Sequence, residues 1–142
     1  MTQFQKISLF LLRVSLGWVF LYAGITALTT PSWSAAGYLK GAKTFVGFYQ
    51  WLLQPNILPT INFVNEWALT LLGISLILGV FVRFSAPLGA VLMLLYYFPI
   101  LAFPYPNARA FVVDDHIIYA AALLTLASLR AGNVWGLGKK FG

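Results

Sequence analysis

The sequence predicts an all-α integral membrane protein, a four-helix bundle with an amphipathic interfacial helix in its first outer loop. Two observations carry this prediction. Of the 142 residues, 61% are hydrophobic and only 8% are charged, whereas about a quarter of the residues in a soluble domain are charged. The apolar residues also gather in four stretches that approach the roughly 20 residues needed to cross a bilayer. We therefore expect residues 1–142 to form a single membrane domain whose exterior faces lipid.

The four expected spans cover residues 7–28, 61–82, 84–103 and 115–131. The fourth is the least continuous and needs its flanking residues to complete a crossing. The link between the second and third spans is so short that these two helices are expected to be antiparallel neighbours. The Gly-rich tail after Arg130 is expected to be a flexible stub.

The connection between the first two spans contains a second helical pattern, over residues 36–53. Its apolar side chains recur at the spacing of one helix face: Tyr38, Ala42, Phe45, Tyr49 and Leu52. Lys40 and Lys43 fall on the opposite side. This pattern predicts a helix lying in the membrane interface, with Trp33 and Trp51 as aromatic anchors. An irregular loop that caps the bundle remains the alternative.

The positions of lysine and arginine predict the orientation. With four spans, five cations share one side, namely Lys6, Arg83, Arg130, Lys139 and Lys140. Three lie on the other side, namely Lys40, Lys43 and Arg109. Because cytoplasmic loops are enriched in these residues, we expect a multi-pass protein of the cell membrane with both termini in the cytoplasm.

Composition also excludes several functions. The net charge of +6 comes from cations that stand singly or in pairs, so no basic stripe for nucleic acid is present and lipid headgroups are the expected partner. The chain has no cysteine, which excludes thiolate-bound iron–sulfur clusters and thiol chemistry within it. One histidine cannot hold a b-type haem alone, so neither haem nor iron–sulfur is expected.

Arg13 and Glu66 are ionisable residues inside expected spans, where burial of a charge is costly. Gly17 and Gly24 share roughly the face of Arg13, so another helix can approach closely there. Glu66 is the natural partner of Arg13, although the two enter from opposite sides. The alternatives are that Arg13 reaches the headgroups and that Glu66, followed by Trp67, marks the outer interface.

A third polar cluster, Asp114-Asp115-His116, opens the fourth span, with Tyr119 one turn beyond Asp115. Carboxylates at a helix N-terminus cap free N–H groups and favour the helix dipole. His116, the only histidine, is suited to proton transfer or to hydrogen bonding a polar headgroup. A zinc site made of this cluster and Glu66 would be rich in carboxylates, and no metal is expected.

These motifs resemble the DoxX family of small four-helix membrane proteins, which includes the DoxD-like subunits of thiosulfate:quinone oxidoreductase. The resemblance rests on Arg13-x3-Gly17-x6-Gly24, on Glu66-x6-Gly73-x5-Gly79-x3-Arg83, on Asp114-Asp115-His116, and on the loop Trp33–Leu53. It extends from about Arg13 to Arg130. One departure is that family members often place a lysine shortly after the glycine equivalent to Gly24, where this chain has Ile-Thr-Ala-Leu.

The resemblance implies a membrane subunit of a quinone-linked oxidoreductase that works with a second subunit or a soluble redox partner. The expected roles divide into three groups. Catalysis falls to His116, Asp115 and Glu66; quinone binding to Arg13, Tyr119 and Trp67; and attraction of a substrate anion to Lys40, Lys43 and Arg109. The alternative from another class is a non-enzymatic scaffold or carrier of lipid or small molecules. Self-association is compatible with both.

Overall fold

The computed structural model describes residues 1–141 and is helical throughout, with no strand in that range. Its four longest helices are α1 (Gln3–Thr29), α4 (Leu58–Leu78), α5 (Val82–Ile100) and α6 (Asp115–Ser128). The short elements are α2 (Ala36–Lys40), α3 (Val46–Leu52), the 3-10 helix η1 (Ala131–Asn133) and α7 (Gly138–Phe141). The all-α prediction is confirmed.

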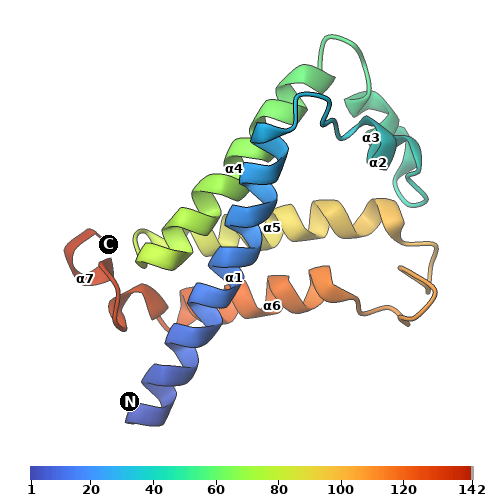
Figure 1. Cartoon of the computed structure of the whole chain (residues 1–142). Helices are drawn as coiled ribbons and strands as arrows, with labels where there is room; N and C mark the ends of the chain where they lie inside the picture. Colours follow the sequence, from blue (N-terminus) through green and yellow to red (C-terminus); the bar gives the residue numbers. More distant parts are fainter. Residues whose placement is uncertain (142) are drawn as a thin grey trace.

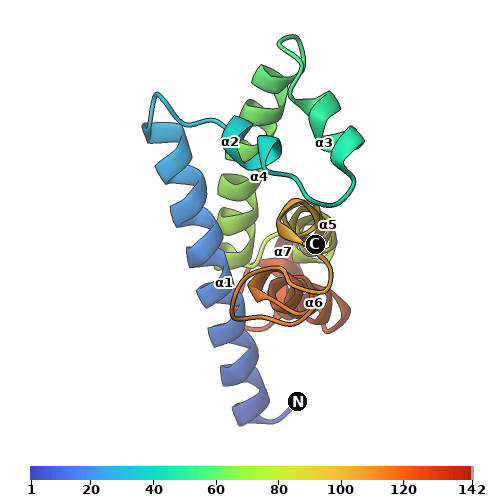
Figure 2. The same cartoon turned by 90° about the vertical axis from the view of Figure 1, so that its right-hand side faces the viewer.

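The long helices are arranged as two crossed pairs. Helix α1 packs along α4, and α5 packs along α6. Figure 2 shows α5 and α6 nearly along their axes, whereas α1 and α4 run up the picture. The expected bundle therefore takes the form of two antiparallel pairs that cross, with a core where they meet. That core contains Leu16, Phe20, Leu72, Leu76, Leu123 and Leu126.

The turn between α4 and α5 explains why those two helices diverge. Helix α4 ends at Gly79, whose φ is +72°, and Phe81 before α5 also has a positive φ of 56°. The two helices separate from this turn in the shape of a V (Figure 1). The expectation of antiparallel neighbours is wrong in orientation only: α4 and α5 contact each other, but they diverge from the turn, and α5 packs along α6.

Three helices (α1, α4 and α5) are long and apolar enough to cross a membrane. Helix α6 has 14 residues, so it rises about 21 Å, less than the roughly 30 Å of a hydrocarbon core. The expected fourth span, residues 115–131, is thus shorter as a helix. Large apolar side chains such as Trp18, Leu88 and Leu124 point outward on these helices, as a lipid-facing surface requires.

The first connection forms two short helices instead of one helix over residues 36–53. The chain leaves the helical conformation between α2 and α3, and Phe45 has a positive φ of 53°. Both helices dock on the end of α5. Lys43 N–H donates to the Pro99 carbonyl at 2.9 Å, and Tyr49 Oη donates to the Leu95 carbonyl at 2.8 Å. The segment thus closes the open end of the V (Figure 1).

Close contact between α1 and α4 depends on glycine, as the face of Gly17 and Gly24 predicts. A Cβ atom added to Gly73 would lie 2.5 Å from the Leu21 nitrogen and 2.7 Å from the Gly17 carbonyl oxygen. A Cβ atom at Gly24 would lie 2.5 Å from the Thr70 nitrogen. Since these obstacles are backbone atoms, a side chain here forces the helices apart.

We therefore expect Gly73→Leu to lower the free energy of unfolding by about 1–3 kcal/mol or more, the usual cost of overpacking. The measurement is thermal or denaturant unfolding of the purified protein in detergent. Gly47→Leu is the matched control, because nothing lies within 4 Å of a Cβ atom there. Equal stability of the two variants would contradict the contact.

Candidate functional site

Arg13 lies at the centre of one end of the molecule. It is fully buried, with 0% of its surface exposed. Its Nη1 donates to the Leu76 and Ile77 carbonyls at 2.7 and 3.1 Å, in the last turn of α4. The last carbonyls of a helix lack partners within it and carry the negative end of its dipole. A buried guanidinium therefore satisfies the end of α4, and neither Glu66 nor the headgroups are its partner.

The same guanidinium holds the C-terminal tail. Nη2 of Arg13 donates to the carbonyls of Val134 and Trp135 at 3.2 and 3.1 Å. The Leu137 N–H donates to the Leu78 carbonyl at 3.0 Å, so the tail runs over the end of α4. Its glycines allow this approach, since a Cβ atom at Gly132 would lie 2.6 Å from the Gly79 oxygen. The expectation of a flexible stub after Arg130 is wrong.

Asp114 and His116 form a polar pair at the start of α6. Asp114 is buried at 6% exposure and caps the helix, accepting from the His116 N–H at 3.0 Å and the Ile117 N–H at 3.3 Å. Its second oxygen lies 2.8 Å from His116 Nδ1. Because a carboxylate accepts hydrogen bonds, this contact assigns the donor proton to Nδ1 of His116. The predicted N-cap is confirmed for Asp114.

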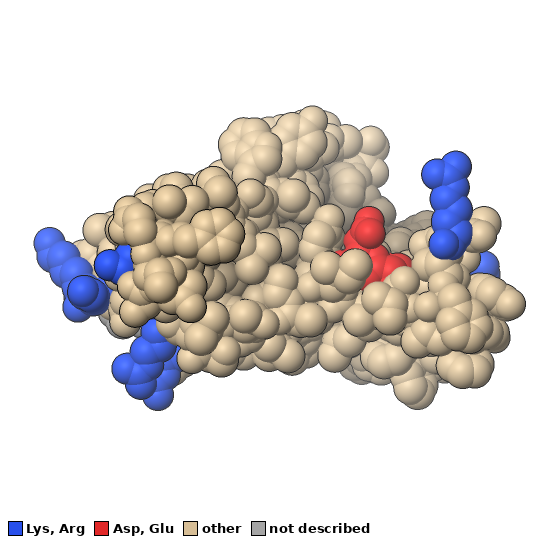
Figure 3. Space-filling view, turned by 90° about the horizontal axis from the view of Figure 1, so that it is seen from below, with Lys and Arg blue, Asp and Glu red and all other residues tan. Residues whose placement is uncertain are grey.

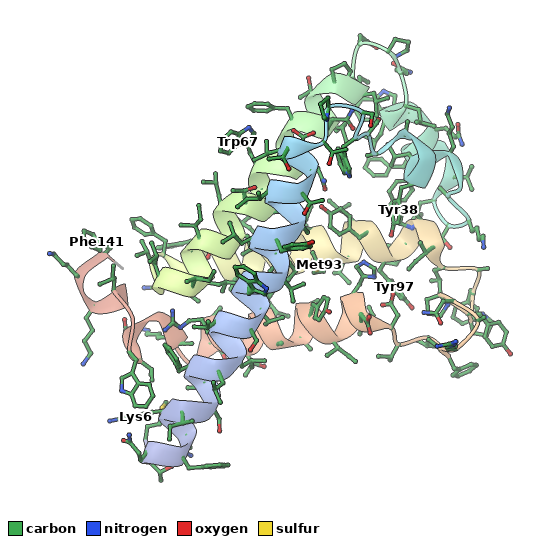
Figure 4. All side chains as sticks on the ribbon, viewed as in Figure 1. Lys6, Tyr38, Trp67, Met93, Tyr97 and Phe141 are labelled. Atoms are coloured by element: carbon green, nitrogen blue, oxygen red, sulfur yellow. The ribbon has the colours of Figure 1, made fainter. Side chains whose placement is uncertain are left out.

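Tyr96 of α5 links this pair to two further helices, α4 and α2. Its ring meets the His116 ring edge to face, with centroids 6.0 Å apart. Its hydroxyl donates to Oδ1 of Asn65 in α4, and its backbone carbonyl accepts from the hydroxyl of Tyr38 in α2. Residues far apart in the sequence therefore converge where the α2–α3 segment covers α4 and α5. Figure 4 shows Tyr38 and Tyr97 at this end of the molecule, far from Lys6 and Phe141.

A cavity of about 200 Å³ lies beside Tyr96, and we call it the tyrosine pocket. Its surface is mostly apolar, and the residues with polar groups along it are Tyr38, Tyr49, Asn65 and Tyr96. Burial raises the pKa of Tyr49, and burial together with the nearby charge of Asp114 raises the pKa of Tyr38. Both hydroxyls therefore stay protonated at neutral pH and act as donors.

The tyrosine pocket adjoins a second, larger cavity. This α4–α5 groove has a volume of about 570 Å³ and is lined almost wholly by apolar side chains of the two helices. Leu92 and Leu95 line both cavities. Ser75 and Ser85, whose hydroxyls are 2.6 Å apart, stand in the groove near the α4–α5 turn. The tyrosine pocket and the α4–α5 groove thus adjoin through a wall that contains Leu92 and Leu95.

The remaining residues predicted for the site do not join this pocket. Glu66 is half-buried and makes no side-chain hydrogen bond or ion pair within residues 1–141. Trp67 is exposed and points away from the helices (Figure 4). Tyr119 packs against Phe20 with ring centroids 5.9 Å apart. Asp115 is exposed on the first turn of α6.

The expected anion-attracting residues are also separate. Arg109 lines an open depression of about 620 Å³ together with Asp114 and Asp115. Lys40 and Lys43 are exposed on the α2–α3 segment and do not line that depression. Across the described part of the chain, no group of three histidine, aspartate or glutamate side chains is placed to hold a metal ion.

Sequence reasoning missed the residues that form the tyrosine pocket. The sequence favoured Glu66 as a site residue, whereas its neighbour Asn65 lines the pocket. Tyr96 and Tyr38 looked like ordinary packing or interface residues. The available signal was that asparagine and tyrosine side chains gather at one end of the spans. It could be used only by knowing that the α2–α3 segment folds back onto α5.

The fold and site define a class: a small helical membrane protein with a buried arginine at one end and a tyrosine-lined pocket at the other. A protein-family model described as DoxX matches residues 8–101. The chain belongs to the DoxX family. Searches of curated proteins and of solved structures each returned no match. The family match covers Arg13, Asn65 and Tyr96 but ends before Asp114 and His116.

Arg13 generates a test of the polar end. We expect Arg13→Met to lower the free energy of unfolding by at least about 2 kcal/mol, because each buried carbonyl left without a donor costs about 1–3 kcal/mol. Arg13→Lys keeps the charge but loses the two-pronged guanidinium group, so its stability should lie between that of the wild type and that of Arg13→Met. Unfolding in detergent, combined with the rate of tryptic cleavage after Arg130, measures both the stability and the release of the tail.

Glu66→Ala is the control for this comparison, because it removes an intramembrane charge that has no ion-pair partner within residues 1–141. It should change stability by well under 1 kcal/mol. A large loss in Glu66→Ala, or none in Arg13→Met, would show that the buried cation is held by something other than the backbone carbonyls.

Proposed function

We propose that the protein is a quinone-binding membrane subunit of an oxidoreductase, with the quinone head in the tyrosine pocket and its isoprenoid tail in the α4–α5 groove. The DoxX family is a membrane protein family often linked to quinone oxidoreductases. The observation that carries the proposal is that Leu92 and Leu95 line both cavities, so a small chamber edged by tyrosines and Asn65 adjoins a longer apolar groove.

The size and donors of the pocket suit a quinone head. An apolar cavity of about 150 Å³ accommodates benzene, so about 200 Å³ has room for one substituted ring. The Oδ1 atom of Asn65 is occupied by the Tyr96 hydroxyl, and its Nδ2 group has no hydrogen-bond partner within residues 1–141. That free amide group is available to donate to a quinone carbonyl, while Tyr38 and Tyr49 flank the ring.

Proton delivery is the role proposed for His116 and Asp114. Conversion of a quinone to a quinol takes two electrons and two protons. His116 is 28% exposed and contacts the ring of Tyr96, so it can take a proton from water and hold it beside the pocket. Asp114 fixes the ring of His116 through Nδ1. Asp115 remains a candidate relay from solvent to this pair.

Electrons come from a partner in this proposal, because the chain has no cysteine to hold a thiolate-bound cluster. A DoxD-like role would make the donor a sulfur oxyanion such as thiosulfate. Lys40, Lys43 and Arg109 are exposed at the pocket end and would attract such an anion. A second subunit or a soluble redox protein would then complete the enzyme.

The test measures binding of a short-tailed quinone to the purified protein in nanodiscs. Quenching of tryptophan fluorescence reports the binding. Tyr96→Phe and Asn65→Leu should each weaken binding at least tenfold, about 1.4 kcal/mol. Tyr22→Phe is the matched control, since Tyr22 is exposed on α1 outside both cavities. Binding that ignores both pocket variants, or no binding by the wild type, would favour the scaffold or carrier function.

Orientation in the cell membrane is proposed from the same charges as before, with both termini cytoplasmic. Basic side chains lie at the two ends of the face in Figure 3; acidic side chains lie between them, nearer one end, and most of the remaining surface is uncharged. Because the chain has no cysteine, Arg109→Cys and Lys140→Cys each introduce one thiol. An impermeant thiol reagent added to intact cells should label Arg109→Cys alone; labelling of Lys140→Cys alone would reverse the orientation.

A further inference from the structure

Five cations at the termini end have no acidic neighbour. They are Lys6 of α1, Arg83 of α5, Arg130 after α6, and Lys139 and Lys140 of α7. All three acidic side chains of the chain belong to the other end, and within residues 1–141 no lysine or arginine side chain forms a salt bridge with them. Four of the five are exposed and Lys6 is half-buried, so together they can attract an anion to this end of the molecule.

Four of these cations surround two adjoining depressions, which we call the cationic cradle. One depression, of about 230 Å³, is lined by Arg83, Arg130 and Lys139. The other, of about 420 Å³, is lined by Lys6, Arg130 and Lys139. Arg130, Asn133 and Lys139 belong to both. A ligand with two anionic groups joined by a short bridge could therefore place one group in each depression, on either side of these three shared residues.

The cradle is held in place by the buried arginine. Arg13 binds the carbonyls of Val134 and Trp135, which fixes the tail between Arg130 and Lys139. Gly132 and Gly138 in the floor are buried. The cations thus come from four separate segments, but the wall they share is attached to the core and is not a loose surface loop.

The apolar rim indicates that the anion is part of a lipid. The larger depression is also lined by Met1, Leu129 and Trp135. Trp135 is exposed and its ring meets that of Phe10 at 5.6 Å, as in the aromatic belts found at headgroup level. Lysine and arginine between helix ends bind phosphate headgroups, and arginine matches phosphate with two hydrogen bonds.

We infer that the cationic cradle is a binding site for the phosphates of an anionic phospholipid, and that it prefers a headgroup with two phosphates over one with a single phosphate. The site is separate from the tyrosine pocket, and its occupancy does not depend on the proposed quinone function. Free phosphate shares the same chemistry but would make no use of the apolar rim.

The experiment uses the full chain, delipidated in mild detergent, with cardiolipin, phosphatidylglycerol, phosphatidylcholine and inorganic pyrophosphate as separate probes. Native mass spectrometry and the shift in melting temperature report binding. Cardiolipin should bind at least tenfold more tightly than phosphatidylglycerol, and phosphatidylcholine should give no shift. Pyrophosphate binding as tight as that of cardiolipin would overturn the lipid assignment.

The matched variants remove equal charge from opposite ends. Arg130→Gln with Lys139→Gln should weaken cardiolipin binding at least tenfold, whereas Lys40→Gln with Lys43→Gln should change it less than twofold. Neither pair removes a side-chain hydrogen bond of the described chain, so the melting temperatures without lipid should match that of the wild type. Equal losses of affinity in the two double variants would show that only the net charge of the protein matters, and would contradict a site in the cationic cradle.

Discussion

A charged group in an apolar interior needs hydrogen-bond partners to be stable, and the two terminal nitrogens of Arg13 find them in main-chain carbonyls, while its Nε has no partner within residues 1–141. Four carbonyls from two distant segments accept from its two terminal nitrogens. The end of a helix is one of the few places where a buried backbone offers several free carbonyls pointing the same way. The position of Arg13 on α1 therefore determines where α4 ends and where the tail must lie.

The geometry of the other end follows from that anchor. With α4 ended at Gly79, the chain turns within three residues into α5, and the two helices diverge because each packs on a different partner. A V between two membrane helices leaves an apolar groove and an open mouth. The α2–α3 segment closes the mouth through Tyr38, Lys43 and Tyr49, and the tyrosine pocket is the space left beneath it.

The sequence predicted those features of the structure that depend on residues close together in the chain. Three spans, the glycine face of α1 and the cap at Asp114 follow from hydropathy, residue size and helix-end chemistry. The partner of Arg13 could not be predicted, because a backbone carbonyl has no sequence signature. The same limit applies to Asn65 and Tyr96, whose pairing depends on the crossing of the helix pairs. The single helix expected over residues 36–53 is instead two short helices, because the contacts of this segment with α5 favour a break that its amphipathic pattern does not predict.

Charge divides between the two ends in a way that gives each a different chemistry. The pocket end carries three cations and all three acidic side chains, while the termini end carries five cations and no acidic side chain. Protons are exchanged where carboxylates and an imidazole coexist, which is the condition at Asp114 and His116. Phosphate is retained where cations lack carboxylate competitors, which is the condition around Arg130 and Lys139. The two proposed sites therefore differ in chemistry as well as in place: the groove leads toward the end that carries the acid–base groups, and the cationic cradle lies at the opposite end of the molecule.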